Sequence, residues 1–165
     1  AAERGTLIRT AQELCPRAHT LGRALIDIVS PCPTFDAAWD PNDNSLVFRL
    51  RWGERTFLFA GDIERAAEDA AVVSPTLLRA DVLKVPHHGS RTSSTETFLD
   101  AVGARIGIVS AGRGNRFGHP HDEVFERLER KLKQVHVTAW NGGVELRTDG
   151  HHVQVRTALG GNLPH

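Results

Sequence analysis

The stretch DVLKVPHHGS, residues 81–90, combines a short apolar strand with a polar turn and decides the fold. Asp81 to Val85 is predicted to be a buried strand, because apolar residues follow one another there and Pro86 ends the run. His87 and His88 then stand at the carboxyl end of that strand. Because neighbouring side chains of a strand point to opposite faces, we expect one imidazole to bind a metal ion and the other to support it.

A loop rich in hydrogen-bond donors follows the two histidines. Gly89 permits a sharp turn or a close approach of the backbone to a ligand. Ser90, Arg91 and Ser93 carry donors suited to an oxyanion such as phosphate. The pattern favours a phosphoryl site, and a polar loop that only caps the neighbouring elements remains the alternative.

A carboxylate also stands at the end of a predicted strand, where Asp62 follows the apolar run Thr56 to Ala60. A side chain in that position is held firmly enough to bind a hard or borderline cation. Asp is equally a favoured N-cap, so Asp62 is predicted either to bind a metal or to cap a helix that starts at Ile63.

The third candidate site is the loop from Asn115 to His121, which lies before a predicted helix. His119 is the better candidate to contact a phosphate or to donate a proton to a leaving alkoxide, and His121 is the weaker one. The alternative is that His121 and Asp122 simply begin the helix.

Interleaved strands and helices predict an α/β or α+β fold with helices packed on a sheet. Hairpin turns are expected at Gly53-Glu54 and Asp149-Gly150. The expected strands are residues 24–29, 45–52, 56–60, 81–85, 106–110, 135–139, 144–147 and 153–156. The expected helices are residues 6–14, 63–73, 94–102 and 122–132, with a short one after Ser74.

Composition limits the classes of protein that remain. With 165 residues and 40% hydrophobic content, we expect a single domain at residues 1–157 and a flexible tail at 158–165. Twenty basic and twenty acidic residues balance, so nucleic acid would have to bind a local patch. No apolar run is long enough for a membrane helix. Cys15 and Cys32 match no zinc motif, and we expect them not to form a disulfide.

At these three sites the sequence resembles the metallo-β-lactamase-like domain of the ComEC family of DNA-uptake competence proteins. The resemblance covers roughly residues 26–150, and its most specific part is LKVPHHGS. The matching motifs are NDNSLV at 42–47, FLFAGD at 57–62, DVLKVPHHGS at 81–90 and NRFGHP at 115–120.

The resemblance implies an αββα sandwich, of which this chain supplies the carboxy-terminal half. It implies two divalent ions, zinc or manganese, with Asp62 and a histidine of the His87-His88 pair among their ligands; His88 is favoured and His87 is the alternative. From the residues themselves, we assign catalytic roles to His87 and His119 and substrate binding to Ser90, Arg91, Ser93 and Asn115. The implied substrate is single-stranded DNA, cleaved beside a membrane channel on the outer face of the cytoplasmic membrane.

One family motif, H-x-H-x-D-H, does not occur in this sequence, and His19 is the only histidine before Asp62. We therefore expect at most half a metal site, in a chain cut from a longer protein that holds the other half. A degenerate member that binds a partner without metal remains an alternative. So does a hydrolase of small phosphoesters, although Arg91, Arg113 and Arg116 offer a basic rim for a nucleic-acid backbone.

Overall fold

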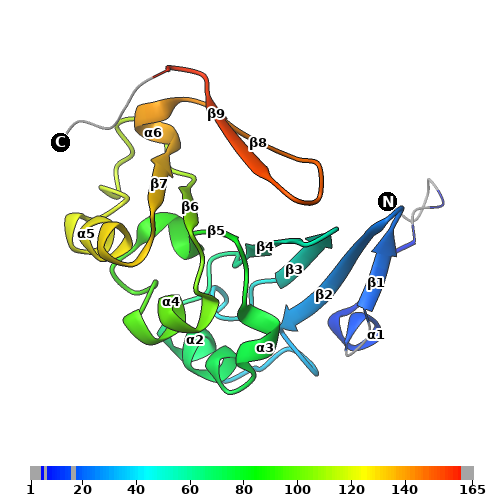
Figure 1. The fold of residues 1–165 in the computed structure, drawn as a ribbon. Helices are drawn as coiled ribbons and strands as arrows, with labels where there is room; N and C mark the ends of the chain where they lie inside the picture. Colours follow the sequence, from blue (N-terminus) through cyan, green and yellow to red (C-terminus); the bar gives the residue numbers. More distant parts are fainter. Residues whose placement is uncertain (1–4, 6, 16–17, 161–165) are drawn as a thin grey trace.

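One seven-stranded sheet organises the computed structural model, which describes residues 5, 7–15 and 18–160 (Figure 1). Its strands lie side by side in chain order, the first four antiparallel and the last four parallel. They are β1 (Ala18–Leu21), β2 (Ala24–Ser30), β3 (Val47–Trp52), β4 (Arg55–Phe59), β5 (Val82–Lys84), β6 (Ile106–Val109) and β7 (Gln134–Val137).

Helices cover one face of this sheet (Figure 1). Leu58, Leu83 and Val109 point from alternate strand positions into a core shared with Phe98 and Leu128, and none of them is exposed. Among the described residues, no helix has the length and apolar character needed to cross a membrane. The helical elements are α1 (Ala11–Leu14), α2 (Arg65–Val72), α3 (Pro75–Leu78), the 3₁₀ turn η2 (Pro86–Gly89), α4 (Glu96–Val102), α5 (Asp122–Lys131) and α6 (Thr138–Asn141).

A separate hairpin of β8 (Val144–Thr148) and β9 (Val153–Thr157) lies across the other face of the sheet (Figure 1). The backbone N–H of Glu54 donates to the carbonyl oxygen of Gly150 at 2.8 Å, which joins the two predicted hairpin turns. A Cβ atom on Gly53 would lie 2.7 Å from that oxygen, so the contact requires glycine. The turn signals at both places are confirmed.

The sheet face that carries no helix is strongly apolar. Strand register places Phe48 opposite Phe59 and Leu50 opposite Phe57, and the rings of Phe48 and Phe59 stack with centroids 4.7 Å apart. Ile108 of β6 lies on the same face through its register with Lys84. The hairpin covers only part of this surface, and Phe59 remains 37% exposed.

The predicted fold class is confirmed, and the differences from the sequence analysis lie at element ends. Strand β1 was not predicted, since its residues alternate weakly and most are exposed. Thr138 and Ala139, predicted to extend β7, begin α6 instead. The predicted helix 6–14 is wrong over residues 7–10, which are not helical, because only Ala11–Leu14 forms α1. Residue 6 and residues 161–165 of the predicted tail lie outside the described residues.

The expectation for the cysteines is wrong. Cys15 and Cys32 form a disulfide, with Cα atoms 5.8 Å apart. The bond ties the end of α1 to the loop after β2, two segments separated by 17 positions in sequence. Sequence spacing did not predict this contact, because it depends on how β1 and β2 pair.

Candidate metal-binding and catalytic site

The predicted site residues meet at one edge of the sheet, where the parallel strands end. Asp62 follows β4, His87 and His88 follow β5, and Ser110 follows β6. Because the carboxyl ends of parallel strands lie at a common edge, residues far apart in sequence become neighbours there. The loop that contains His119 completes the group, with its ring centroid 5.8 Å from that of His87.

Asp62 is available as a ligand because another residue caps the following helix. Helix α2 begins at Arg65, and Asp43 Oδ1 accepts the backbone N–H of Glu64 at 2.7 Å. Ser45 Oγ meanwhile accepts the backbone N–H of Asp62 at 3.1 Å. Asp62 is therefore not the N-cap of α2. The motif NDNS at 42–45 supplies the two side chains, Asp43 and Ser45, that accept these backbone N–H groups.

The two adjacent histidines lie in a tight turn rather than on an extended strand. His87 has φ 45° and His88 has φ 56°, a left-handed conformation that is uncommon outside glycine. Ser93 Oγ donates to the carbonyl oxygen of Pro86 at 3.2 Å and braces the turn. The expectation of opposite faces fails for this reason, and both imidazoles reach the same edge. Backbone strain of this kind concentrates at functional sites.

His88 has the geometry of a metal ligand. Its Nδ1 lies 2.6 Å from the carbonyl oxygen of Ser110, and since a carbonyl only accepts, Nδ1 carries the proton. The other nitrogen, Nε2, then presents a lone pair to Asp62 Oδ1 at 3.5 Å. Two acceptors facing each other repel unless a cation or a proton lies between them.

The spacing of these two atoms fits a shared ion. Two ligand atoms on one tetrahedral zinc ion, each at about 2.0–2.1 Å, lie roughly 3.3 Å apart. Among the residues that the structure describes, no group of three or more His, Cys, Asp or Glu side chains is arranged to hold an ion. Asp62 and His88 are thus a pair of potential ligands, and the metal site expected from the sequence stays a prediction.

His87 pairs with a residue that the sequence analysis did not single out. Its Nδ1 lies 2.9 Å from Glu64 Oε1, and Thr92 Oγ1 donates to the same oxygen at 2.9 Å. Glu64 was missed because it reads as an ordinary first-turn helix residue. The signal that could have identified Glu64 as a site residue was its position two residues after Asp62.

Lys84 is a second residue near the site that was not singled out. Its Nζ donates to the carbonyl oxygen of Gly61 at 3.4 Å. Burial lowers the pKa of Lys84, and the nearby Asp62 carboxylate opposes that shift. The ammonium group therefore lies beside the predicted ligand and contributes positive charge to the site.

His119 lies within a group of imidazoles. Its ring centroid is 4.9 Å from that of His121 and 6.4 Å from that of His88. Burial, followed by the charge of His121 and the other neighbouring imidazoles, lowers the pKa of His119. The side chain is consequently neutral at pH 7, where it donates or accepts a hydrogen bond without adding a charge.

The four predicted substrate-binding residues differ in how far they are exposed to solvent. Arg91 is exposed and close to the imidazoles, with its backbone N–H donating to His121 Nδ1 at 3.2 Å. Ser90 and Ser93 are buried. Asn115 accepts the backbone N–H of His119 at 2.9 Å and donates to its carbonyl oxygen at 2.7 Å, so it holds the loop in place. Of the four, Arg91 is the one that is exposed, and Asn115 is half-buried.

The sheet thus carries helices on one face, and an aspartate and histidines follow the carboxyl ends of its parallel strands. Against models of protein families, residues 18–113 match the metallo-beta-lactamase superfamily. Because this match spans more than half of the chain, the chain belongs to that superfamily.

Two curated relatives indicate the branch of the superfamily to which the chain is similar. ComE operon protein 3 of Bacillus subtilis (strain 168) is 37% identical over 106 residues, which are 64% of this chain and 14% of that protein. Recombination protein 2 of Haemophilus influenzae is 36% identical over 117 residues, 71% of this chain and 15% of that protein. These relatives are ComEC-family proteins, and the resemblance stated from the motifs is confirmed.

A comparison with solved structures matches the crystal structure of a putative Zn-dependent hydrolase of the metallo-beta-lactamase superfamily from Thermotoga maritima. The two share 17% identity with a TM-score of 0.48, over 74% of this chain and 69% of the other.

Proposed function

We propose that this chain carries half of a metal-dependent phosphodiesterase site that cleaves a strand of DNA during uptake. The observation that carries the proposal is the orientation of His88, whose Nδ1 is held by Ser110 while Nε2 faces Asp62. An imidazole fixed through one nitrogen presents the other to a metal, as metal-binding histidines commonly do.

Asp62 and His88 would hold an ion between them. When bound, divalent ions in such sites lower the pKa of a coordinated water towards about 7 and stabilise charge on a phosphoryl group. His87 Nδ1 faces Glu64, so its Nε2 is available to accept a proton from the attacking water. His119, kept neutral, donates its N–H to a phosphoryl oxygen or relays a proton to the leaving alkoxide.

Exposed side chains beside the imidazoles favour a single strand as substrate. Phe117 is 60% exposed, and its ring stacks on His119 with centroids 5.6 Å apart. The guanidinium carbon of Arg116 lies 4.9 Å from the centre of the Phe117 ring. An aromatic ring joined to a cation is the arrangement on which unpaired bases stack and phosphates bind. Arg91 adds a second cation on the same side.

The other half of the site would come from a preceding segment of the same domain. That segment would cover the apolar sheet face of Phe48, Leu50, Phe57 and Phe59. Phe59, at 37% exposed, leaves apolar surface that a second sheet would remove from water. The matched region is 14–15% of the length of the two relatives, so such a segment has room to exist in the parent protein.

The location proposed for the domain is the outer side of the cytoplasmic membrane, next to a channel of the same protein. Disulfides persist in oxidising compartments and are rare in the bacterial cytosol. The Cys15–Cys32 bond supports an outward orientation.

The test is cleavage by a longer chain that includes the preceding segment, with manganese or zinc added. We expect single-stranded DNA to be cut and activity to fall by orders of magnitude in Asp62→Ala and in His88→Ala. The matched control is His151→Ala, an exposed histidine on the β8–β9 turn that should leave cleavage unchanged. Intact DNA with every metal would overturn the nuclease function.

Two other outcomes would favour one of the two alternative functions over the nuclease. Hydrolysis of a small phosphodiester, such as bis(p-nitrophenyl) phosphate, without cleavage of DNA would indicate a small-molecule hydrolase of the same fold. Failure of zinc and manganese to raise the melting temperature of the longer chain would indicate a metal-free binding module, because a bound ion stabilises the folded state by mass action.

A further inference from the structure

A second exposed aromatic ring lies at the sheet edge that carries the candidate site. It belongs to Trp140 on the short helix α6, which directly follows the carboxyl end of β7. Trp140 is 41% exposed, although Ala139 and Asn141 on either side of it are buried. The roles assigned above to the candidate site do not involve this ring.

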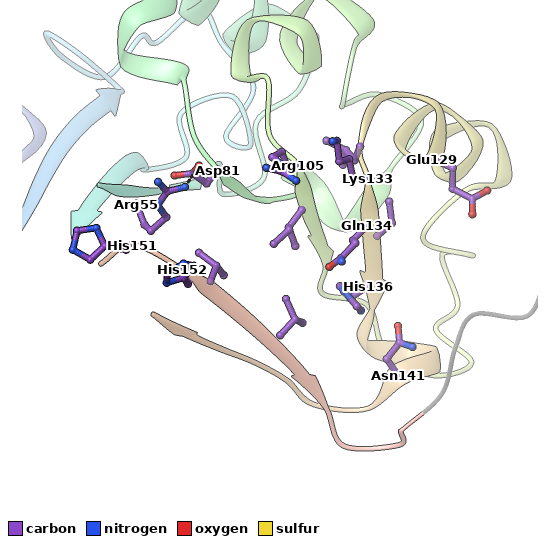
Figure 2. A pocket seen from close by; sticks show the side chains of 15 residues that line it. Arg55, Asp81, Arg105, Glu129, Lys133, Gln134, His136, Asn141, His151 and His152 are labelled. Carbon is purple, nitrogen blue, oxygen red and sulfur yellow. Dashed lines mark hydrogen bonds and ion pairs between the residues drawn. The ribbon is translucent and has the colours of Figure 1, made fainter. Parts of the chain in front are cut away.

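The backbone of α6 directs Trp140 away from the open sheet face. Asn141 lines the space between the sheet and the β8–β9 hairpin (Figure 2), and its Oδ1 accepts the backbone N–H of Val137 at 2.8 Å. Trp140 instead contacts Phe125 of α5, with ring centroids 4.8 Å apart and ring planes at 82°. Helix α5 packs on the helix-covered face of the sheet. The indole therefore lies outside the apolar face that a preceding segment would cover.

Arg113 places a cation beside this ring. Its Nε donates to the carbonyl oxygen of Ala139, the residue before Trp140, at 3.3 Å. Arg113 is exposed, and within the part of the chain that the structure describes it forms no ion pair. The outer side of its guanidinium group is therefore available to a phosphate, which this planar group binds well.

The loop between β6 and α5 carries both Arg113 and Arg116. Residues 111–119 read AGRGNRFGH, with two arginines and no acidic residue. Gly114 and Gly118 have φ 63° and 69°, and a Cβ atom on either would meet no other atom within 4 Å. The loop is therefore basic and open, as a surface for a phosphate backbone must be.

Hydrogen bonds fasten this loop to α6. Thr138 Oγ1 donates to the carbonyl oxygen of Ala111 at 2.8 Å and accepts the backbone N–H of the same residue at 2.9 Å. Four residues separate Arg113 from Phe117, so their Cα atoms are at most about 14 Å apart. The Arg113–Trp140 pair and the Arg116–Phe117 pair are consequently neighbours on one edge of the molecule.

We infer that a single strand of DNA extends from the candidate site along this edge, with one base stacked on Phe117 and a later base stacked on Trp140. The phosphates between these bases lie on Arg116 and Arg113. Aromatic platforms with cations between them bind single strands of any sequence, because every base has an aromatic face. The inference rests on the proposed phosphodiesterase function and adds to it the path of the strand, which requires a substrate long enough to reach α6.

Binding of a labelled oligothymidine to the 165-residue chain, followed by fluorescence anisotropy, tests the path. A length of about ten nucleotides is within the range of single-strand sites. We expect one oligonucleotide per chain and about tenfold weaker binding by Trp140→Ala, because a stacked base is lost. The same oligonucleotide should quench tryptophan fluorescence, and Trp140→Phe should remove that quenching.

Salt dependence distinguishes the cation from the ring. The slope of log affinity against log salt should become shallower by about 0.7 in Arg113→Gln, the change for one phosphate contact with a single strand. Trp140→Ala should leave this slope unchanged, because stacking releases no counterion.

A similar pair at the opposite edge of the sheet supplies the matched controls. The guanidinium carbon of Arg23 lies 5.8 Å from the centre of the Trp52 ring. Trp52 precedes β4, whereas Asp62 follows the carboxyl end of that strand. Trp52→Ala and Arg23→Gln should therefore leave binding unchanged. Melting temperatures within a few degrees of the unsubstituted chain exclude misfolding of the variants.

Weaker binding by Phe117→Ala, with unchanged binding by Trp140→Ala and Arg113→Gln, would overturn the path and leave the nuclease function standing. Equal losses in Trp52→Ala and Trp140→Ala would also contradict the path. So would equal affinity for the corresponding duplex, whose paired bases cannot stack on the rings, or no binding at low salt. Cleavage by the longer chain is a separate measurement and decides the nuclease function.

Discussion

The Nδ1 atom of His88 lies 2.6 Å from the backbone carbonyl oxygen of Ser110, and this contact fixes the tautomer of the imidazole. In the neutral ring, Nε2 is therefore the nitrogen without a proton, and it faces Asp62. We predict that nitrogen NMR of the metal-free protein above pH 8 will show His88 as the Nδ1–H tautomer. A dominant Nε2–H form would contradict the orientation on which the metal site depends.

Sequence predicted the components of this site, and the structure supplied the contacts among them. Asp62, His87, His88 and His119 were recognisable because each follows an apolar strand or lies in a loop between elements. The left-handed turn at the two histidines was not predictable, because nothing in the residue types distinguishes it from a strand end. Glu64 was missed because its partner, His87, is 23 positions away.

Predictions of the fold succeeded where local signals are strong. The turn residues Gly53-Glu54 and Asp149-Gly150 correctly predicted two hairpins, and apolar runs correctly predicted the parallel strands. The sequence did not predict the disulfide or strand β1, and both omissions have a common reason. Both depend on pairing between distant segments, and the residues of β1 carry too little hydrophobic contrast to show it.

Glu68 is fully buried and is predicted to be a stability determinant. Its two carboxylate oxygens accept the backbone N–H groups of Ser94 and Thr95, just before α4. Glu68→Ala leaves a buried donor on Ser94 and a half-buried one on Thr95 without these partners, so we expect a loss of about 3 kcal/mol in the free energy of unfolding. Urea denaturation measures this, with exposed Glu129→Ala as a control that should change stability little. Equal stability of both variants would contradict the assignment.

The same residue makes stability depend on pH. Burial raises the pKa of Glu68 above its ordinary value of 4.5, against the opposing hydrogen bonds. A raised pKa in the folded state gives a contribution that is complete below pH 4.5 and is lost as pH rises through the folded-state pKa. The unsubstituted protein should therefore lose stability relative to Glu68→Gln as pH increases over that interval. A constant difference between the two proteins would show that the pKa is not raised.

Phe117 is predicted to hold an unpaired base beside the site. Phe117→Ala should weaken binding of a short single-stranded DNA by roughly tenfold, because base stacking on an aromatic ring contributes about 1–3 kcal/mol. Fluorescence anisotropy with labelled oligonucleotides measures the change. Phe35→Ala removes a comparably exposed ring elsewhere and serves as the control. If the two substitutions have equal effects, Phe117 has no specific part in binding.

The disulfide is predicted to stabilise the chain. A cross-link that closes a loop of 17 positions contributes roughly 3 kcal/mol by restricting the unfolded chain. Cys15→Ser/Cys32→Ser should therefore lower the denaturation midpoint, and reduction of the unsubstituted protein should do the same. The double variant itself should not respond to reductant. No difference between oxidised and reduced protein would mean that the bond does not form in solution.

The most direct test of the metal site is a zinc titration of this chain followed by the imidazole nitrogen resonances. We predict that zinc shifts Nε2 of His88 strongly and Nδ1 weakly, and that Asp62→Ala weakens the response while exposed His151→Ala leaves it unchanged. Zinc-induced shifts confined to other histidines, or an undiminished response in Asp62→Ala, would contradict a metal site built on Asp62 and His88.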